Sequence, residues 1–320
     1  MEIIKDTFIK FVSKRKKYYQ ISVVIIFIGI ISLLLQGFNY GIDFAGGTLM
    51  QLDFEQNASV TEIRTILGEM NLSSSSIQSL SGNEFVIRTD EIALQQRQEI
   101  LEIIENNIGP FEVLKIEMVG PVIGESLKRL AIFAIIFAFI GIILYITFRF
   151  EFKYAITSII ALGHDVLVAL GILSILQKEI TIPIIAAILT IVGYSLNNTI
   201  VIFDRLRENL RIKSRSTLED TIDLSINQSL TRTINTAITT LLPVIALYFF
   251  GGTLSDFAFV LLIGIVVGTY SSICIAGPLL LELKKRGKVS SQKGILTEQN
   301  VTEKKVKTSK KIKVKKKKNN

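Results

Sequence analysis

The stretch LAIFAIIFAFIGIILYITF (residues 130–148) contains no charged residue. A helix of this length can cross the hydrocarbon core of a bilayer, which requires about 20 residues. Hydrophobic residues make up 49% of the 320 residues, and Trp is absent. Five further apolar stretches of comparable length lie at 18–36, 154–176, 180–203, 233–250 and 257–281. The pattern predicts an α-helical membrane protein with six transmembrane helices.

Charge in the connecting segments predicts the orientation of these helices. Lys and Arg are frequent in residues 1–17 and in the 204–232 loop, whereas residues 37–129 carry six basic and fourteen acidic residues. Basic residues close to a span favour the cytoplasmic side. We therefore expect residues 1–17, the 204–232 loop and both chain ends in the cytoplasm, and residues 37–129 outside.

The C-terminal segment 282–320 forms a separate Lys-rich tail. Residues 283–320 hold fifteen basic and two acidic residues and show no apolar periodicity. Such a composition predicts a disordered cytoplasmic tail attracted to anionic lipids. Ribosomal RNA is a second possible partner of this charge, but we expect no specific nucleic-acid site.

The external segment 37–129 contains its own order of predicted elements. Alternating strands at 48–54 and 111–119 flank a hairpin at 76–89, and amphipathic helices are predicted at 59–70 and 91–107. The resulting β-α-β-β-α-β order is typical of a ferredoxin-like α+β unit. We expect this small domain to bind or transmit movement, because it contains no recognisable active site.

The residue inventory argues against an enzyme. Cys274 and His164 are the only residues of their types, and both lie within predicted spans. This excludes disulfides and Cys-rich metal sites, and no phosphate-binding P-loop motif occurs. A Ser-His-Asp site built on His164 is a remote alternative. We therefore expect no catalytic residue, metal or cofactor.

Polar residues inside the spans are the better functional candidates. Asp165 follows His164 near the middle of its span, where a carboxylate is costly and by default functional. Two helical stripes complete the set, namely Tyr194, Ser195 and Asn198 with the flanking Asn197 and Thr199, and Arg232, Thr236, Thr239 and Pro243. The polar faces of these three spans could satisfy one another's hydrogen-bonding groups. The alternative for the polar side chains is ordinary interhelical hydrogen bonding. The alternative for Arg232 is that its side chain only extends to the membrane interface. Asn198 lies about 9 Å from Asp165 in depth at 1.5 Å per residue, which argues against direct contact.

Five motifs in order resemble the SecF family of the bacterial Sec protein-translocation machinery. They are GIDFAGGT (41–48), VGP (119–121), HDV (164–166), GYSLNNTIVIFDRLREN (193–209) and SLTRTINTAITTLLPVIALYFFGG (229–252). The motif residues include Gly41, Asp43, Gly46, Gly47, Asp204 and Arg205. The resemblance extends from about residue 10 to residue 285 and implies the six-helix half of an RND-type transporter.

The resemblance also implies partners and an energy source. It implies the bacterial inner membrane as location, with SecD contributing six more helices, SecYEG as the translocon, and YajC or YidC-like subunits nearby. The pair would use the proton-motive force to help secreted polypeptides leave the channel on the outer side. Candidate relay residues are then Asp165, His164, Asn198 and Arg232.

One position departs from the family pattern. The family motif in the fourth span reads Asn-Asp-Thr, whereas this chain reads Asn197-Asn198-Thr199. An amide cannot bind and release a proton, so the relay could run through Asp165, through the partner, on another ion, or not at all. A structural clamp without ion conduction, or half of an RND-type exporter of lipids or small molecules, are the alternative functions.

Two local motifs predict packing and a helix start. Gly264 and Gly268 form a small-residue pair that lets helices approach closely, either within this chain or against SecD. Ser216 and Glu219 have the spacing of a capping box and predict a helix from about residue 217 to 230.

Overall fold

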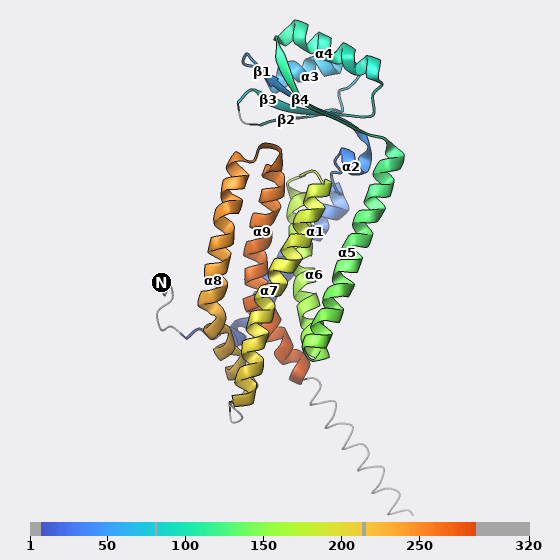
Figure 1. The fold of residues 1–320 in the computed structure, drawn as a ribbon. Helices are drawn as coiled ribbons and strands as arrows, with labels where there is room; N and C mark the ends of the chain where they lie inside the picture. The colour runs from blue at the N-terminus through green and yellow to red at the C-terminus, as the bar shows by residue number, and fades with distance from the viewer. Residues whose placement is uncertain (1–7, 81, 213–215, 286–320) are drawn as a thin grey trace, which may run out of the picture.

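Six membrane-length helices carry a small α+β domain at one end (Figure 1). The computed structural model describes residues 8–80, 82–212 and 216–285. The expected Lys-rich tail therefore lies outside the described residues from position 286 onward. The long helices are α1 (Arg15–Gln36), α5 (Pro121–Arg149), α6 (Phe152–Ile175), α7 (Ile182–Ile212), α8 (Leu218–Phe250) and α9 (Ser255–Ser271). The six predicted spans are confirmed by these helices.

Short helical segments flank the long helices. The turns η1 (Val12–Lys14) and η2 (Gly252–Leu254) precede α1 and α9, and α2 (Ile42–Ala45) connects α1 with the α+β domain. Directly after α9, residues Ser272–Ala276 form a π-helical segment, η3, inside the last span.

Several helices extend beyond the apolar stretches that predict them. Helix α5 begins at Pro121, because Gly120 is its N-cap and a proline at the first helical position has its φ already set for a helix. Helix α8 begins at Leu218 and continues without a break into its span. Thr217, not Ser216, caps α8 and accepts the N–H of Asp220, so the predicted Ser216–Glu219 capping box is wrong by one position.

The α+β domain has the predicted ferredoxin-like order. Its elements are β1 (Gly47–Phe54), α3 (Val60–Glu69), β2 (Ser76–Ser79), β3 (Glu84–Thr89), α4 (Leu94–Ile108) and β4 (Phe111–Val119). The strands are antiparallel in the order β2-β3-β1-β4, with Met50 opposite Ile87 and Ile116. Helices α3 and α4 cover the sheet face that points away from the membrane helices (Figure 1).

Alternation along the strands supplies the core of this domain. Met50 and Leu52 on β1, together with Ile87 on β3, point to one face and are fully buried, where they meet Ile63 of α3 and Ile100 of α4. Each such side chain contributes roughly 1.5–3 kcal/mol on burial. One hydrophobic core is therefore enough to hold the two helices on the sheet.

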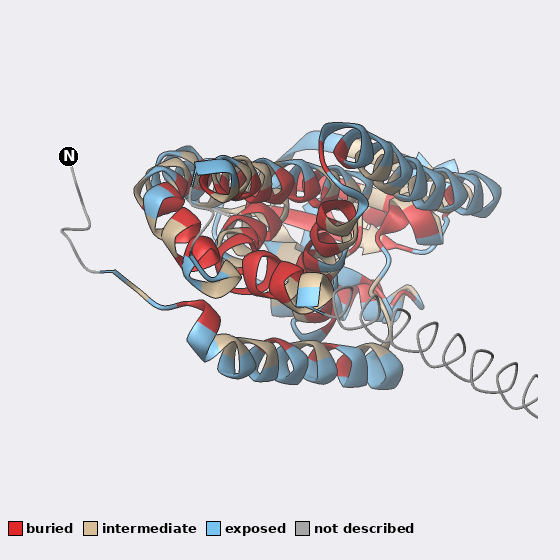
Figure 2. Cartoon of the chain, turned by 90° about the horizontal axis from the view of Figure 1, so that it is seen from below, coloured by how far each residue is buried: buried red, intermediate tan, exposed pale blue. Residues whose placement is uncertain are grey.

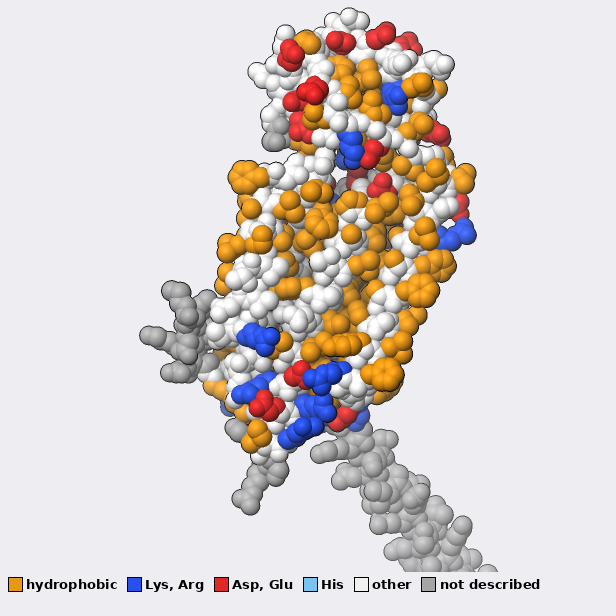
Figure 3. Space-filling model, viewed as in Figure 1, with side chains coloured by type: hydrophobic (Ala, Val, Ile, Leu, Met, Phe, Trp, Pro, Cys, Tyr) orange, Lys and Arg blue, Asp and Glu red, His pale blue; other side chains and the backbone are white. Residues whose placement is uncertain are grey.

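Helices α6, α7 and α9 form the centre of the membrane bundle. In each of these helices, half or more of the most apolar stretch is buried inside the chain. In α1, α5 and α8 less than a fifth of the corresponding stretch is buried. Viewed along the bundle, buried residues lie on the sides where helices face one another and exposed residues lie on the periphery (Figure 2). On the face shown in Figure 3, the side of the bundle is largely apolar between the end where Lys and Arg gather and the α+β domain, which carries acidic side chains.

Glycines set the close approach of these helices. A Cβ added at Gly264 would come within 2.1 Å of Ile191, and one at Gly268 within 2.8 Å of Ser195. The Gly264–Gly268 pair on α9 thus packs on α7 within this chain. A second contact of this kind joins α1 to α6, where a Cβ at Gly29 would lie 2.8 Å from the Cα of Gly171.

Replacing Gly264 with Leu should destabilise the isolated chain. The added side chain would overlap Ile191, and overpacking of this kind costs about 1–3 kcal/mol. Thermal unfolding of the detergent-solubilised protein measures the effect. Gly141→Leu is the matched control, because nothing lies within 4 Å of a Cβ at Gly141 on the exposed face of α5. An unchanged unfolding temperature for Gly264→Leu would contradict the α7–α9 contact.

Candidate functional site

Asp165 lies where α6, α7 and α9 meet, and its side chain is completely buried. One carboxylate oxygen, Oδ2, accepts hydrogen bonds from Ser195 Oγ on α7 (2.5 Å) and from Ser271 Oγ on α9 (2.8 Å). The other, Oδ1, lies 2.9 Å from His164 Nδ1. The carboxylate therefore joins the three central helices of the bundle.

His164 extends this network to α1. Nδ1 of His164 faces Asp165, and Nε2 lies 3.0 Å from Ser22 Oγ. When the carboxyl is ionised it can only accept, so Nδ1 then donates to it and Nε2 of a neutral ring accepts from Ser22. The ring also lies beside Tyr270 of α9, with centroids 6.2 Å apart. The hydroxyl of Tyr270 in turn donates to the carbonyl oxygen of Tyr18 at 3.0 Å.

The π-helical segment η3 begins directly after Ser271. Ser272, its first residue, lies 2.9 Å from Thr199 Oγ1 and donates to carbonyl oxygens of Ser195 and Gly268. Single π-helical turns inside α-helices are frequent at functional sites. Two consecutive serines stand at this wider turn, where Ser271 contacts Asp165 of α6 and Ser272 contacts α7.

Sequence reasoning missed Ser22, Ser271, Ser272 and Tyr270. The two adjacent serines are polar residues inside an apolar span, which is the same signal that identified Asp165. Ser22 carries no such signal, because it lies near the start of its span and only the tertiary contact with His164 reveals its place.

Asn198 lies on the same face of α7 as Ser195 but outside the Asp165 network. It is 3% exposed, and its amide Nδ2 has no hydrogen-bond partner within the described chain. The hydroxyl of Tyr194 likewise has none there. Asn197 points to the exposed face of α7. The structure therefore separates the Asn198 amide from the buried carboxylate.

The polar stripe of α8 does not join this site. Arg232 is exposed, and the hydroxyl of Thr236 donates to the Arg232 carbonyl oxygen of its own helix. Thr239 is satisfied in the same way by the carbonyl oxygens of Asn235 and Thr236. The expected mutual satisfaction of polar faces is therefore wrong for α8, whose threonines bond to their own helix. Residues of α9 and α1 join α6 and α7 in its place.

Asp204 and Arg205 link helix ends at the basic end of the bundle. Asp204 of α7 forms an ion pair with Arg149 at the end of α5, at 3.1 Å. Arg205 donates through Nε to Gln228 Oε1 of α8 at 2.7 Å and pairs with Glu208. These motif residues have a structural role in the described contacts.

The GIDFAGG segment forms the junction between the bundle and the α+β domain. The N–H of Gly41 donates to the carbonyl oxygen of Ile180 at 2.9 Å, and Asp43 accepts the N–H of Ile182 at 2.8 Å. Ile182 is the first residue of α7, where an acidic partner satisfies an otherwise unpaired N–H. Gly46 and Gly47 have φ angles of +81° and +132°, and a Cβ at Gly47 would lie 2.4 Å from the Thr89 carbonyl oxygen.

The loop between α6 and α7 also contacts the α+β domain, through an ion pair. Arg88 of β3 forms an ion pair with Glu179 at 2.8 Å, and both side chains are largely buried. Burial raises the pKa of the Glu179 carboxyl, and the neighbouring Arg88 guanidinium opposes that rise. Lys178 pairs with Asp256 near the start of α9 at 2.7 Å. The helices that carry Asp165 and Ser195 are thus joined, through their connecting loop, to the α+β domain.

No three His, Cys, Asp or Glu side chains of the described residues lie together in a way that could hold a metal ion. The side chains that contact the Asp165 carboxyl are one imidazole and two hydroxyl groups.

Two family models match the chain. "Protein export membrane protein SecD/SecF, C-terminal" matches residues 100–286, and "SecD/SecF GG Motif" matches residues 31–58. The second match covers the junction segment described above.

Curated relatives match over nearly their full length. The chain is 41% identical over 297 residues to the protein translocase subunit SecF of Calditerrivibrio nitroreducens, covering 89% of this chain and 97% of the relative. The corresponding subunit of Sebaldella termitidis is 42% identical over 291 residues, covering 89% and 94%.

Two solved structures share the fold. SecDF of Thermus thermophilus, described as a translocon-associated membrane protein, is 38% identical with a TM-score of 0.81, covering 88% of this chain and 39% of that one. SecDF in a super-membrane-facing form is 37% identical with a TM-score of 0.70, covering 91% and 41%. This chain therefore spans about two fifths of the length of those solved proteins.

Replacing Arg88 with Gln should loosen the junction. The variant leaves Glu179 buried without its cation, which we expect to cost about 1–3 kcal/mol of local stability. Hydrogen exchange should become faster at Ile180, whose N–H donates to Asn39, and at Ile182, whose N–H donates to Asp43. Arg64→Gln on the exposed face of α3 is the control. Unchanged exchange at both isoleucines would contradict the anchoring role of the pair.

Proposed function

Because the chain belongs to the SecF family of protein translocase subunits, we propose that it pairs with a SecD-like chain and uses the proton-motive force to promote release of exported polypeptides. The solved relative named SecDF is a longer chain, of which this chain covers 39%. The SecYEG translocon is the proposed site of action, since that relative is described as translocon-associated.

The observation that carries the proton part of this proposal is the buried carboxyl of Asp165. A carboxylate inside a span is costly and by default functional. All three of its hydrogen-bond partners are hydroxyls or an imidazole, and these groups can donate or accept. Ser271 also has a second acceptor, the Gly268 carbonyl oxygen at 3.2 Å. The site can therefore satisfy Asp165 in both its ionised and its protonated form.

Coupling to the α+β domain would follow from the position of the α6–α7 loop. Asp165 lies on α6 and accepts a hydrogen bond from Ser195 of α7. Protonation of Asp165 would replace the charge-assisted hydrogen bonds from Ser195 and Ser271 with weaker neutral ones. A resulting shift between α6 and α7 would reach the domain through Glu179 and Arg88, and through the bridge between Ile180 and Tyr40.

A structural clamp without ion conduction is the second candidate function. The observation that favours it is Asn198, an amide at the position where the family motif has an aspartate. In that case the partner chain would carry the proton, and the Asp165 network would only hold the helices together. Interhelical hydrogen bonds in membranes contribute about 0.6–2 kcal/mol each, which is sufficient for such a role.

Replacing Asp165 with Asn should separate the two functions. We expect Asp165→Asn to reduce export driven by the proton gradient to the level measured without this subunit, while co-purification with the SecD-like partner remains normal. Export of a preprotein into energised membrane vesicles is the measurement. We expect Asn198→Asp to be tolerated, because the family motif has an aspartate at this position.

Asp204→Asn is the matched control, since this carboxylate is partly exposed and pairs with Arg149 at the basic end of the bundle. It should leave gradient-driven export unchanged. Normal export by Asp165→Asn over a range of pH and membrane potential would exclude proton transfer by this chain and leave the clamp function.

We also propose that the α+β domain lies outside the bacterial inner membrane and the basic end of the bundle inside. Lys and Arg gather at the end opposite the domain (Figure 3), as expected for a cytoplasmic surface. The termini themselves lie outside the described residues.

Cysteines introduced at exposed Gln98 and Ser216 should react with an impermeant thiol reagent from opposite sides of the membrane. Gln98 should react from the outside and Ser216 only after the cytoplasmic face is opened. The unmodified chain is the control, because its Cys274 is buried. Reaction of both introduced cysteines from the same side would contradict the proposed topology.

A further inference from the structure

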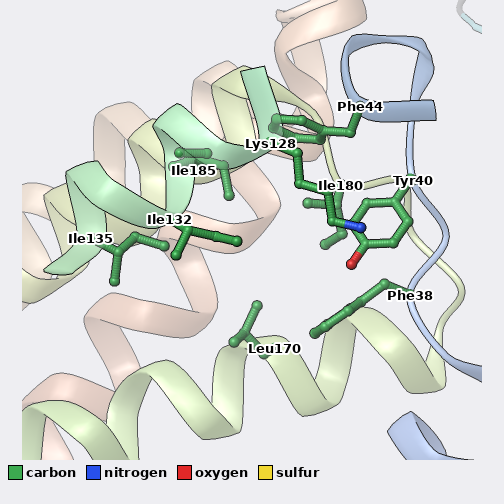
Figure 4. Close-up of a pocket in the computed structure, with 10 residues that line it drawn as sticks. Phe38, Tyr40, Phe44, Lys128, Ile132, Ile135, Leu170, Ile180 and Ile185 are labelled. Carbon is green, nitrogen blue, oxygen red and sulfur yellow. The ribbon is translucent and has the colours of Figure 1, made fainter. Parts of the chain in front are cut away.

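A cavity of about 220 Å³ lies between α5 and the junction with the α+β domain (Figure 4). Its walls come from segments far apart in the sequence. Apolar side chains line most of it, namely Phe38, Phe44, Ile132, Ile135, Leu170 and Ile185. An engineered cavity of about 150 Å³ with a similar apolar lining accepts benzene, so this one is large enough for a segment of hydrocarbon chain.

Lys128 is the one charged side chain among the lining residues. Its ammonium group lies 4.1 Å from the centre of the Tyr40 ring. Within the described residues no carboxylate forms an ion pair with it, whereas the next residue, Arg129, pairs with Glu125. The cavity thus combines an apolar interior with a cation that lacks an anionic partner in this part of the chain.

The cavity extends from Lys128, just before the uncharged stretch 130–148, into the apolar part of the span. Lys128 is the eighth residue of α5, close to the domain junction. Ile135 lies seven residues further along the same helix, or about 10 Å deeper at 1.5 Å per residue. Ile132, between them, is 52% exposed on the surface that would meet lipid.

We propose that this cavity binds an anionic phospholipid from the leaflet next to the α+β domain. One acyl chain would occupy the apolar part, and the headgroup phosphate would pair with Lys128. Lipid is the solvent that surrounds the bundle at this depth, and the lone cation favours an anionic headgroup over a zwitterionic one. Because Phe44 and Ile180 line the same cavity, the bound lipid would contact both halves of the junction.

The absence of Trp from the chain allows a direct test. The full-length protein with the single substitution Phe38→Trp is placed in vesicles of phosphatidylcholine that contain brominated phosphatidylglycerol or brominated phosphatidylcholine, whose bromines quench tryptophan fluorescence on contact. Half-maximal quenching should require about five-fold less of the anionic lipid, as one lysine near a membrane surface contributes about 1 kcal/mol. Ile132→Trp is a second reporter, at a partly open site that accommodates a larger side chain.

Two controls separate binding from general contact with lipid. Phe133→Trp, on the exposed side of α5 and not part of the lining, should be quenched equally by both lipids. In the Phe38→Trp protein, Lys128→Gln should abolish the preference for the anionic lipid, and Arg129→Gln should preserve it.

Equal quenching of both cavity reporters by the two lipids would overturn the proposal, as would an unchanged preference after Lys128→Gln. Protection of both cavity reporters from either brominated lipid, with Phe133→Trp quenched normally, would mean that protein covers the cavity and would also overturn it.

Discussion

Burial of one carboxylate determines how the central helices of this protein are arranged. An ionised group placed in a medium of low polarity is tolerated only when hydrogen-bond donors surround it. For Asp165 the donors come from three places, namely Ser195 on α7, Ser271 on α9 and His164 on its own helix. These contacts fix the rotation of α6 relative to its two neighbours.

The hydrogen bonds to Asp165 require α7 and α9 to approach each other closely. This close approach explains the small residues nearby. Ser195 contacts Asp165 through its hydroxyl, and its Cβ lies where a side chain on Gly268 would otherwise stand. A larger residue at Gly268 would push α9 away from α7 and lengthen the Ser271 contact with the carboxylate. The π-helical turn after Ser271 belongs to this arrangement, because Ser272 then reaches both Thr199 and the backbone of Ser195.

The connection between the bundle and the α+β domain depends on backbone contacts as much as on charge. Gly41 and Asp43 bond directly to the backbone at Ile180 and Ile182, and Gly47 has a backbone conformation and a neighbour that exclude a side chain. The Arg88–Glu179 pair adds a largely buried ion pair to the same loop. The loop that joins α6 to α7 is therefore held from the domain side, while the two helices are held together at Asp165.

Local sequence patterns determined the six spans, the strand and helix order of the α+β domain, and the unusual status of Asp165. Hydropathy and periodicity are properties of neighbouring residues along one helix or strand, so they could be evaluated without the fold. The depth of Asn198 in its span likewise argued against contact with Asp165. Only the tertiary structure decided that Ser22, Ser271 and Tyr270 join Asp165 and His164, and that the polar stripe beginning at Arg232 lies on the outer side of α8. These outcomes depend on helix rotation and crossing, which are set by the packing of side chains from distant segments and leave no pattern in any single span.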